Sequence, residues 1–492
     1  MATTGLWMLA AVAVTLIATG LPAWTVLIGV AVAFSGVGLL VGAFTLPILT
    51  AIPARILGLL ENDLLQALPL YVLMGALLNH LPLAQTLFRA TNRAFGRSGA
   101  GTALAGLGLG VLLAPMNGSV GASVATLSRT MFPRLDAAGM PAENSAALVC
   151  VASTLGVIVP PSLVLILLSD AMMRAHTEAL VGTGAAQRVI NTQDVFAGAL
   201  VPAAILLAID VLVTWKMRRG KREAATAFAS RLTAGEWVSA AATASFVAGL
   251  LIAVTLGYLY AVEAAAAGGV GLVLYGLATR SLTRAVLNAV LRDTMAITGT
   301  LFALLVGATV FTLILRAYGT DRWVAAALIA LPGGALVTLA VVLASLALCA
   351  LVLDAFEMIF VVIPVVMPPL LTQIGDATWV AVLTLLILQA SFLTPPFGYS
   401  VLMVRNSVRR SLSARGMARA LAPYLAAQLT VLALMLSWPA LVWRPNPSDL
   451  HSAASPASAS EDEQRRALER QLEQNAEGET TDAASDPPAK PH

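Results

Sequence analysis

The sequence predicts an all-α polytopic membrane protein made of two inverted repeats, each with a re-entrant hairpin and a helix broken at a double proline. Composition gives the class, since 58% of the 492 residues are hydrophobic and 11% are charged, whereas about 25% are charged in soluble domains. The repeat is indicated by prolines, because one spacing of three prolines occurs twice, 235 residues apart. The two sets are Pro133, Pro160 and Pro161, and Pro368, Pro395 and Pro396. Membrane helices interrupted at matching positions of two repeats indicate the binding site of a transporter.

Ten apolar runs approach the length of about 20 residues that a bilayer crossing needs. In the first half of the chain they are 6–20, 23–45, 64–81, 148–170 and 195–215. In the second half they are 237–256, 258–278, 296–315, 379–401 and 421–443. The first run lacks a basic flank and leads directly into the second, so we interpret it as a helix rather than a signal peptide.

Two further apolar segments, 101–131 and 336–366, are broken near their middle, at APMNGSVG and CALVLDAF. Each half has roughly 15 residues, or about 22 Å of helix, which is shorter than a hydrocarbon core of about 30 Å. Irregular backbone inside a membrane must be buried in protein or line a cavity. We therefore expect hairpin 1 and hairpin 2 to be re-entrant, with their tips at mid-depth.

Basic residues predict the orientation of the chain. They cluster in five segments: 89–97, 129–134, 216–222, 280–292 and 405–419. The positive-inside rule puts all five in the cytoplasm and both termini outside, which requires inverted repeats. The expected organisation is repeat 1 at 1–220, a basic cytoplasmic linker at 221–236, repeat 2 at 237–445 and an acidic tail at 446–492. The tail is rich in Pro, Ala and Ser and is predicted to be disordered.

The tip of hairpin 1 combines small residues with oxygen-bearing side chains. It reads Asn117, Gly118, Ser119, Val120, Gly121 and Ala122. Oxygens at helix breaks hold Na⁺ in membrane proteins, although Gly, Ala and Ser also favour close helix packing. Both interpretations stay open on this stretch alone.

Asp354 stands 235 residues after Ser119, and Glu357 follows on the same helical face. A carboxylate in mid-membrane costs about 2.5–3.5 kcal/mol, so ion or proton coupling, or anchoring of the hairpin tip, is one interpretation. The other is that Asp354 caps the second arm of hairpin 2. Asp210, in an apolar run, is interpreted as an interfacial or packing residue.

The double prolines remove backbone donors, so carbonyls one turn earlier lose their partners. Nearby Thr154 and Thr394 add hydroxyl oxygens at each break. No GxxxxGK[ST], HExxH or CxxC pattern occurs, the four histidines are scattered, and Cys150 and Cys349 lie in apolar runs. We therefore expect a gradient-driven process without ATP hydrolysis and no enzyme activity.

The hairpin tips and proline breaks described above resemble those of the large membrane subunit of TRAP (tripartite ATP-independent periplasmic) transporters, and the resemblance covers about 1–445. Within that family the chain resembles the mannitol/chloroaromatic or 2-oxo-acid type clade. The motifs are NGSVGASVATL, CVASTLGVIVPPSLVLILLSD, LDAFEMIFVVIPVVMPP and LQASFLTPPFGYSVLMVR. The family often has Ser or Thr where Asn117 stands and Gly where Ser153 stands. Asn117 keeps an oxygen, whereas Ser153 is bulkier at the break.

The resemblance implies an elevator-type, ion-transporter-superfamily-like permease that uses the Na⁺ gradient to import a small organic acid, with a 2-oxo acid as one candidate. It implies three partners besides the bilayer: a small four-helix membrane subunit, a periplasmic substrate-binding protein and the organic acid. It also implies a bacterial inner-membrane location, no organic cofactor and no nucleic acid.

The hairpin tips and breaks would form the sites. The expected substrate-binding and tip residues are Asn117, Gly118, Ser119, Val120, Gly121, Asp354, Pro395, Pro396 and Gly398. The expected Na⁺-binding residues are Ser119, Ser153, Thr154, Gly156, Pro160, Asp354, Thr394 and Pro395, and Asp354 and Glu357 are the candidates for coupling.

Three alternatives remain on the sequence alone. One is a single-component secondary anion carrier of the same superfamily, which needs no partners. Another is a proton-coupled transporter of that superfamily. A membrane-embedded enzyme is the alternative from a different class, and it would need more clustered acids, bases or metal ligands than Asp354 and Glu357 supply.

Overall fold

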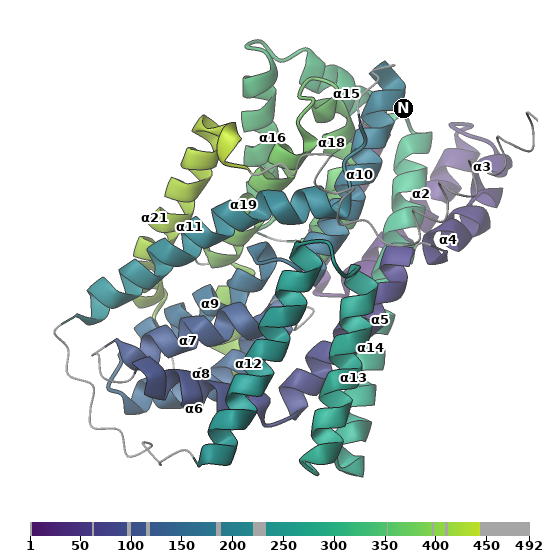
Figure 1. The fold of residues 1–492 in the computed structure, drawn as a ribbon. Coiled ribbons are helices and arrows are strands. Elements are labelled where there is room, and N and C mark those ends of the chain that lie inside the picture. The colour runs from purple at the N-terminus through teal and green to yellow at the C-terminus, as the bar shows by residue number, and fades with distance from the viewer. Residues whose placement is uncertain are drawn as a thin grey trace, which may run out of the picture. The chain divides into compact units, whose positions relative to one another are not determined.

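The computed structural model describes residues 2–61, 63–95, 100–114, 119–183, 188–219, 233–351, 353–395, 398–408 and 412–442. The regular structure within these ranges is helical, without β-strands (Figure 1). Residues 221–232 of the predicted linker 221–236 lie outside the described residues. The rest of this linker is described, and a helix begins in it. The predicted tail at 446–492 lies outside the described residues altogether.

The helices follow one another in two series. The first series is α1 (Ala2–Thr19), α2 (Ala23–Leu40), α3 (Leu46–Thr50), α4 (Ile52–Leu60), α5 (Asp63–His80), α6 (Leu83–Phe95), α7 (Gly101–Leu113), α8 (Val120–Ala137), α9 (Ala142–Ile158), α10 (Leu163–Thr183) and α11 (Thr192–Arg218). The second begins with α12 (Ala234–Thr255), α13 (Ala261–Ala278), α14 (Arg284–Ala317), α15 (Thr320–Ile329) and α16 (Ala335–Cys349). It continues with α17 (Ala355–Glu357), the π-helix η2 (Met358–Val362), α18 (Ile363–Leu371), α19 (Ala377–Leu393), α20 (Tyr399–Ser407), α21 (Ala414–Ser437) and η3 (Pro439–Leu441).

The helix bounds confirm the two-repeat fold. Adding 235 to the bounds of α9 gives 377–393, which are the bounds of α19. The same shift moves the start of α8 onto the start of α17, and α7 onto α16 to within one residue at each end. Figure 1 shows α6, α7 and α8 at the bottom of the view, and α15, α16 and α18 at its top. The two hairpins thus approach from opposite ends, as inverted repeats require.

Within the described residues, seven helices are long and apolar enough to cross a membrane, or eight if the bent pair 46–60 and 65–80 is one span. Two of the ten predicted crossings, 6–20 and 379–401, correspond to shorter helices, α1 and α19. The run 379–401 is shorter because the break after Leu393 divides it. The run predicted at 23–45 ends at Leu40, and the sequence did not predict α3 and α4 after it.

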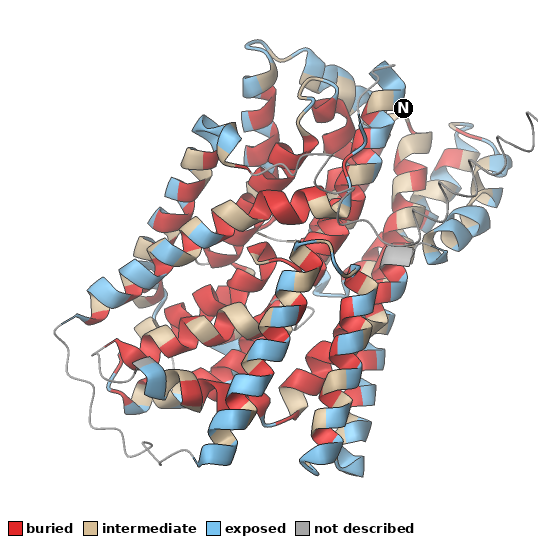
Figure 2. Ribbon diagram, in the orientation of Figure 1, coloured by how far each residue is buried: buried red, intermediate tan, exposed pale blue. Residues whose placement is uncertain are grey.

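The helices pack in two groups. The hairpin group contains α7–α11 and α16–α21, in which α9 contacts α7, α8, α19 and α21. The outer group contains α1–α5 and α12–α14, in which α14 contacts α2 and α5, and α13 contacts α5. Every residue of α19 is buried, whereas α12 and α13 are largely exposed on one side (Figure 2). Apolar helices with exposed apolar faces are those expected to face lipid.

Candidate functional site

Each hairpin tip begins its second arm with an N-cap residue, but the capping bonds differ. Ser119 is the N-cap of α8, and its Oγ accepts the N–H of Ala122 at 3.1 Å. Asp354 is the N-cap of α17, and its own N–H donates to Glu357 Oε2 at 3.2 Å. Asp354 therefore stands at the N-cap position, and the side chain that bonds there is that of Glu357. Asn117 and Gly118 lie outside the described residues.

The break in repeat 1 lies between Ile158 and Leu163. Pro160 has no N–H and cannot donate to the carbonyl of Gly156, while Ser162 Oγ donates to the Val157 carbonyl at 3.4 Å. A Cβ on Gly156 would lie 2.5 Å from the backbone carbonyl of Ala114, at the end of the first arm of hairpin 1. Glycine at 156 therefore allows the break and the hairpin tip to touch.

A small cavity of about 10 Å³ lies at this contact. Its oxygen-bearing lining residues are Ser119, Ser123 and Ser153, and Gly156 also lines it. This volume is roughly that of one water-sized particle. The Ser153 hydroxyl donates to the Cys150 carbonyl at 2.8 Å, which leaves the lone pairs of its oxygen to accept. A cluster of neutral oxygens around a particle-sized cavity fits a monovalent cation such as Na⁺.

The break in repeat 2 is satisfied by a similar contact, with further bonds from Thr394. Thr394 donates its N–H to the Ser391 carbonyl at 3.1 Å and its hydroxyl to the Ala390 carbonyl at 2.8 Å. Ser400 Oγ donates to the Phe392 carbonyl at 2.6 Å, which replaces the donor that Pro396 lacks. Pro396 itself lies outside the described residues. In each repeat, a serine after the double proline thus donates to a carbonyl that a proline leaves without its donor: Ser162 to Val157 and Ser400 to Phe392.

Sequence reasoning missed Tyr399 as a candidate site residue. Its hydroxyl would lie 3.0 Å from a Cβ placed on Gly121 in hairpin 1, and its ring packs on Phe392 with centroids 6.3 Å apart. Asp354 and Glu357 lie within electrostatic reach of it. Tyr399 therefore connects the tip of hairpin 1 with the break of repeat 2. Its position directly after the PPFG motif was the available signal.

The candidate residues fall into two groups rather than one. The cavity brings together Ser119, Val120, Ser153 and Gly156. Thr154 is buried, but its hydroxyl donates to the Val151 carbonyl at 3.0 Å and it is not among the cavity residues. The members from repeat 2 lie elsewhere, at the tip of hairpin 2 and at the second break. They are Asp354, Glu357, Thr394, Pro395 and Gly398.

Acidic residues contribute little to the cavity. Within the described ranges, no three His, Cys, Asp or Glu side chains gather as a metal-binding group. The sequence indicates that Asp210 is an interfacial or packing residue. In the structure it lies on α11 and is buried, with 2% of its surface exposed. It therefore belongs to the interior of the hairpin group and not to its surface.

The hairpin group is buried and helical, has two matched breaks and packs against apolar outer helices. This arrangement defines a multi-pass membrane transporter built from two repeats. The family model for "Tripartite ATP-independent periplasmic transporter, DctM component" matches residues 10–441. The chain therefore belongs to the family of large permease subunits of TRAP transporters. This confirms the family resemblance of its motifs, without assigning a clade.

Known relatives agree with this membership. The C4-dicarboxylate TRAP transporter large permease protein of Pseudomonas aeruginosa is 29% identical over 41% of this chain and 42% of its own length. A putative TRAP transporter large permease protein of Haemophilus influenzae is 22% identical over 78% of this chain and 91% of its own. Among solved structures, the YdaH transporter of Alcanivorax borkumensis has a TM-score of 0.59 over 81% of this chain and 89% of its own, at 17% identity. That last likeness concerns the fold alone.

Proposed function

We propose that this permease uses the Na⁺ gradient to import a small organic acid that a periplasmic binding protein delivers. The observation that carries the proposal is the cavity of neutral oxygens between the tip of hairpin 1 and the first break. Gradient-driven carriers place their coupling ions at such helix breaks. The chain is thus a transporter subunit and not an enzyme.

In this proposal Ser119, Ser153 and Gly156 would hold Na⁺, with Ser123 as a fourth oxygen-bearing neighbour. Bound Na⁺ supplies one positive charge that offsets the charge of an anionic substrate. Ser119 also caps α8, so the residue that would sense the ion also fixes the start of the second hairpin arm. The substrate would bind at the two tips, next to Tyr399.

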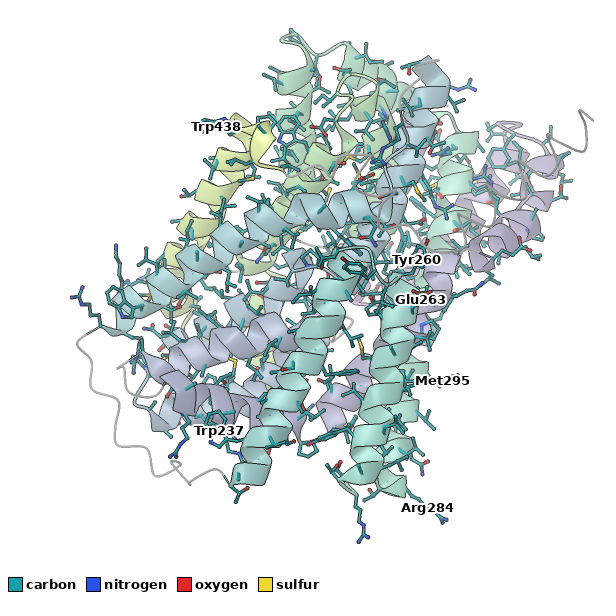
Figure 3. All side chains as sticks on the ribbon, viewed as in Figure 1. Trp237, Tyr260, Glu263, Arg284, Met295 and Trp438 are labelled. Atoms are coloured by element: carbon teal, nitrogen blue, oxygen red, sulfur yellow. The ribbon has the colours of Figure 1, made fainter. Side chains whose placement is uncertain are left out.

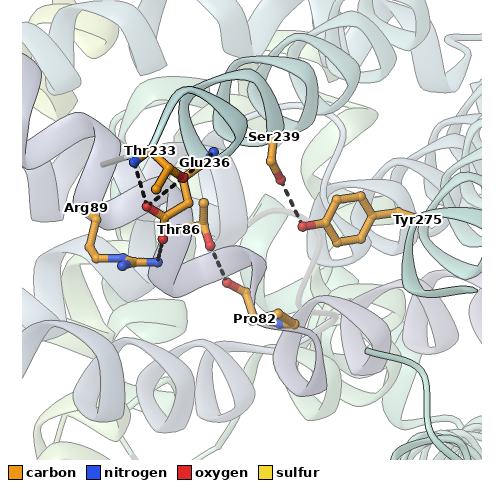
Figure 4. A network of polar contacts seen from close by, with 7 residues as sticks. All are labelled: Pro82, Thr86, Arg89, Thr233, Glu236, Ser239 and Tyr275. Carbon is orange, nitrogen blue, oxygen red and sulfur yellow. Dashed lines mark hydrogen bonds and ion pairs between the residues drawn. The ribbon is translucent and has the colours of Figure 1, made fainter. Parts of the chain in front are cut away.

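The movement we propose is an elevator motion of the hairpin group against the outer group. α6 and its counterpart α15 connect the two groups, because each lies between an outer helix and a hairpin arm in the chain. Arg89 on α6 forms an ion pair of 2.7 Å with Glu236 at the start of α12 (Figure 4). Ser239 and Tyr275 connect α12 to α13 at 2.9 Å in the same network. These contacts would keep the connecting helix on the outer group while the hairpins move.

The orientation we propose places the basic end of the molecule in the cytoplasm. Figure 3 shows Trp237 and Arg284 toward the lower ends of α12 and α14, with Trp438 toward the top of the view. Tryptophan favours both membrane interfaces, and Lys and Arg favour the cytoplasmic side. The lower end would thus face the cytoplasm, and the N-terminus and the tail would lie in the periplasm of a bacterial inner membrane.

The partners we propose are the small four-helix membrane subunit and the periplasmic binding protein. The apolar outer faces of α12, α13 and α14 are available to the small subunit and to lipid; exposed side chains there include Ile252, Val270 and Met295. Two relatives are named for C4-dicarboxylates and sialic acid. Both are carboxylates, which supports an organic acid here. The alignments with the first two relatives span 42% and 36% of those proteins.

The test needs no substrate. The melting temperature of the purified chain is followed as NaCl replaces KCl at fixed ionic strength. We expect Na⁺ to raise it, since a ligand at roughly ten times its Kd stabilises the folded state by about 1.4 kcal/mol. Ser153→Ala should abolish the rise. Ser169→Ala is the matched control, because this buried serine also donates to its own helix, to Leu165 at 2.6 Å, away from the cavity.

An equal response to NaCl and KCl in the unmodified chain would reject sodium binding by the isolated permease. A pH-dependent response in its place would favour proton coupling through Asp354 and Glu357. A Na⁺ response that survives Ser153→Ala would move the ion away from the first break.

A further inference from the structure

A second, larger cavity lies between the two packing groups. Its volume is about 470 Å³, within the range of small-molecule sites. It is lined by α4, α5 and α14 of the outer group and by α10, η2 and α18 of the hairpin group. Residues of neither hairpin tip nor either proline break line it, so it is distinct from the candidate sodium site.

Charges in this cavity do not balance. Arg174 pairs with Asp170 at 3.0 Å, and Arg316 pairs with both oxygens of Glu178 at 3.0 and 2.9 Å. Arg55 also lines the cavity and, among the described residues, makes no ion pair. Three arginines and two acidic residues thus line the cavity, which leaves one net positive charge.

The other walls are mostly apolar. Leu59 and Leu305 line the cavity from the outer group, and Ile359 and Phe360 line it from the hairpin group. The hydroxyls of Thr309 and Thr312 lie there as well, but they donate to carbonyls of their own helix at 2.8 Å. They have no proton left for a second acidic group or a sugar hydroxyl oxygen.

We infer that this cavity binds a monocarboxylate with a hydrocarbon body, with the carboxylate on Arg55 and the body against the apolar walls. The inference rests on the proposed function and extends it: the cavity is a second site for the organic acid, separate from the two tips, and its chemistry narrows that acid to a monoanion with an apolar chain. A guanidinium group binds a carboxylate through two parallel hydrogen bonds. One uncompensated arginine therefore matches one carboxylate and does not match a dicarboxylate.

Binding of 4-methyl-2-oxopentanoate to the purified full-length chain is measured by calorimetry at constant ionic strength, with acetate and succinate as comparators. We expect the branched monocarboxylate to bind most tightly, since acetate lacks the hydrocarbon body and succinate carries a second charge. Arg55→Gln should weaken its binding by about tenfold or more, as removal of a charge-assisted contact does. Arg322→Gln is the control, because this exposed arginine on α15 lies outside the cavity.

Glu178→Gln tests the charge argument in the opposite direction. It frees Arg316 and raises the net charge of the cavity by one, so succinate should gain affinity more than the monocarboxylate does. A variant that only damaged the fold would not gain affinity for any anion. This second variant keeps the inference testable if Arg55→Gln lowers the protein yield.

Equal affinity in the unmodified chain and in Arg55→Gln would overturn the inference, as would tighter binding of succinate than of the branched acid. If the monocarboxylate does not bind but the Na⁺-specific rise in melting temperature is intact, only the inference that this cavity binds the acid is overturned. Monocarboxylate binding without any Na⁺ response would support the cavity and reject the sodium part of the proposed function.

Discussion

Gly156 is the residue at which helix packing and the proposed ion site meet. A Cβ at 156 would lie 2.5 Å from the Ala114 carbonyl carbon and oxygen, and backbone atoms there cannot move aside as a flexible side chain would. We predict that Gly156→Ala destabilises the protein by about 1–3 kcal/mol, the usual cost of overpacking, and removes the Na⁺ response. Gly108→Ala on α7 is the control, because a Cβ there would meet no atom within 4 Å. Melting temperatures in NaCl and KCl compare the two, and an unchanged Gly156→Ala protein would contradict the close contact.

Asp210 is a buried acid without full compensation. Its Oδ1 has no hydrogen-bond partner among the described residues, while the hydroxyls of Thr214 and Tyr424, one turn further along α11 and on α21, bond each other at 2.8 Å. An uncompensated polar group in an interior costs about 1–3 kcal/mol, so we predict that Asp210→Asn raises the melting temperature. A large loss of transport with unchanged or higher stability would instead assign Asp210 a role in coupling.

At the scale of elements, the ion pair between α6 and α12 is predicted to contribute modestly. Glu236 accepts the Thr233 N–H at 2.9 Å and pairs with Arg89 at 2.7 Å. Glu263 caps α13 in the same way, through the Tyr260 N–H at 2.9 Å. Both Gln variants keep an acceptor for the cap, so Glu236→Gln should be slightly less stable than Glu263→Gln, because only Glu236 loses a partly exposed ion pair.

Salt distinguishes this contribution from the cap. The difference between the two variants should shrink in about 1 M salt, where the Debye length falls to about 3 Å. A difference that does not depend on salt would mean that Arg89 contributes by packing on α6 instead of by charge.

The sequence predicted the elements that long apolar runs and prolines define. Hairpins, breaks and the offset of 235 were all accessible, because each follows from length, hydropathy or a missing donor. α6 and α15 were missed because they are short and not apolar enough to suggest a crossing. The end of α2 had a signal that was overlooked: Gly42 at φ +70°, with the Ala43 N–H donating to the Gly38 carbonyl at 2.8 Å, forms the usual glycine stop of a helix.

Contacts between helices that are distant in the chain could not be predicted from the sequence. Ser119, Ser153 and Gly156 could be named from motifs, but their meeting around one cavity depends on how α7 and α9 cross. Tyr399 approaches Gly121 only because α20 of repeat 2 packs on α8 of repeat 1. Side-chain partners across such distances follow from the arrangement of the whole molecule, and no local pattern encodes them.

At the scale of the whole molecule, the proposed elevator motion requires the hairpin group to slide past the outer group. Arg316 on α14 and Glu178 on α10 join the two groups through two hydrogen bonds. The test uses a chain in which Cys150 and Cys349 are replaced and cysteines are placed at 178 and 316. A reductant-cleavable cross-linker between them should stop uptake of the organic acid in cells that express the complete transporter. Cleavage of the linker should restore uptake.

Cysteines at 239 and 275, where Ser239 and Tyr275 connect two outer helices at 2.9 Å, provide the matched control, since a link within one group should leave uptake unchanged. Full uptake with 178 and 316 cross-linked would rule out sliding along α14, because a covalent bridge of a few ångströms cannot follow a movement between membrane faces about 30 Å apart.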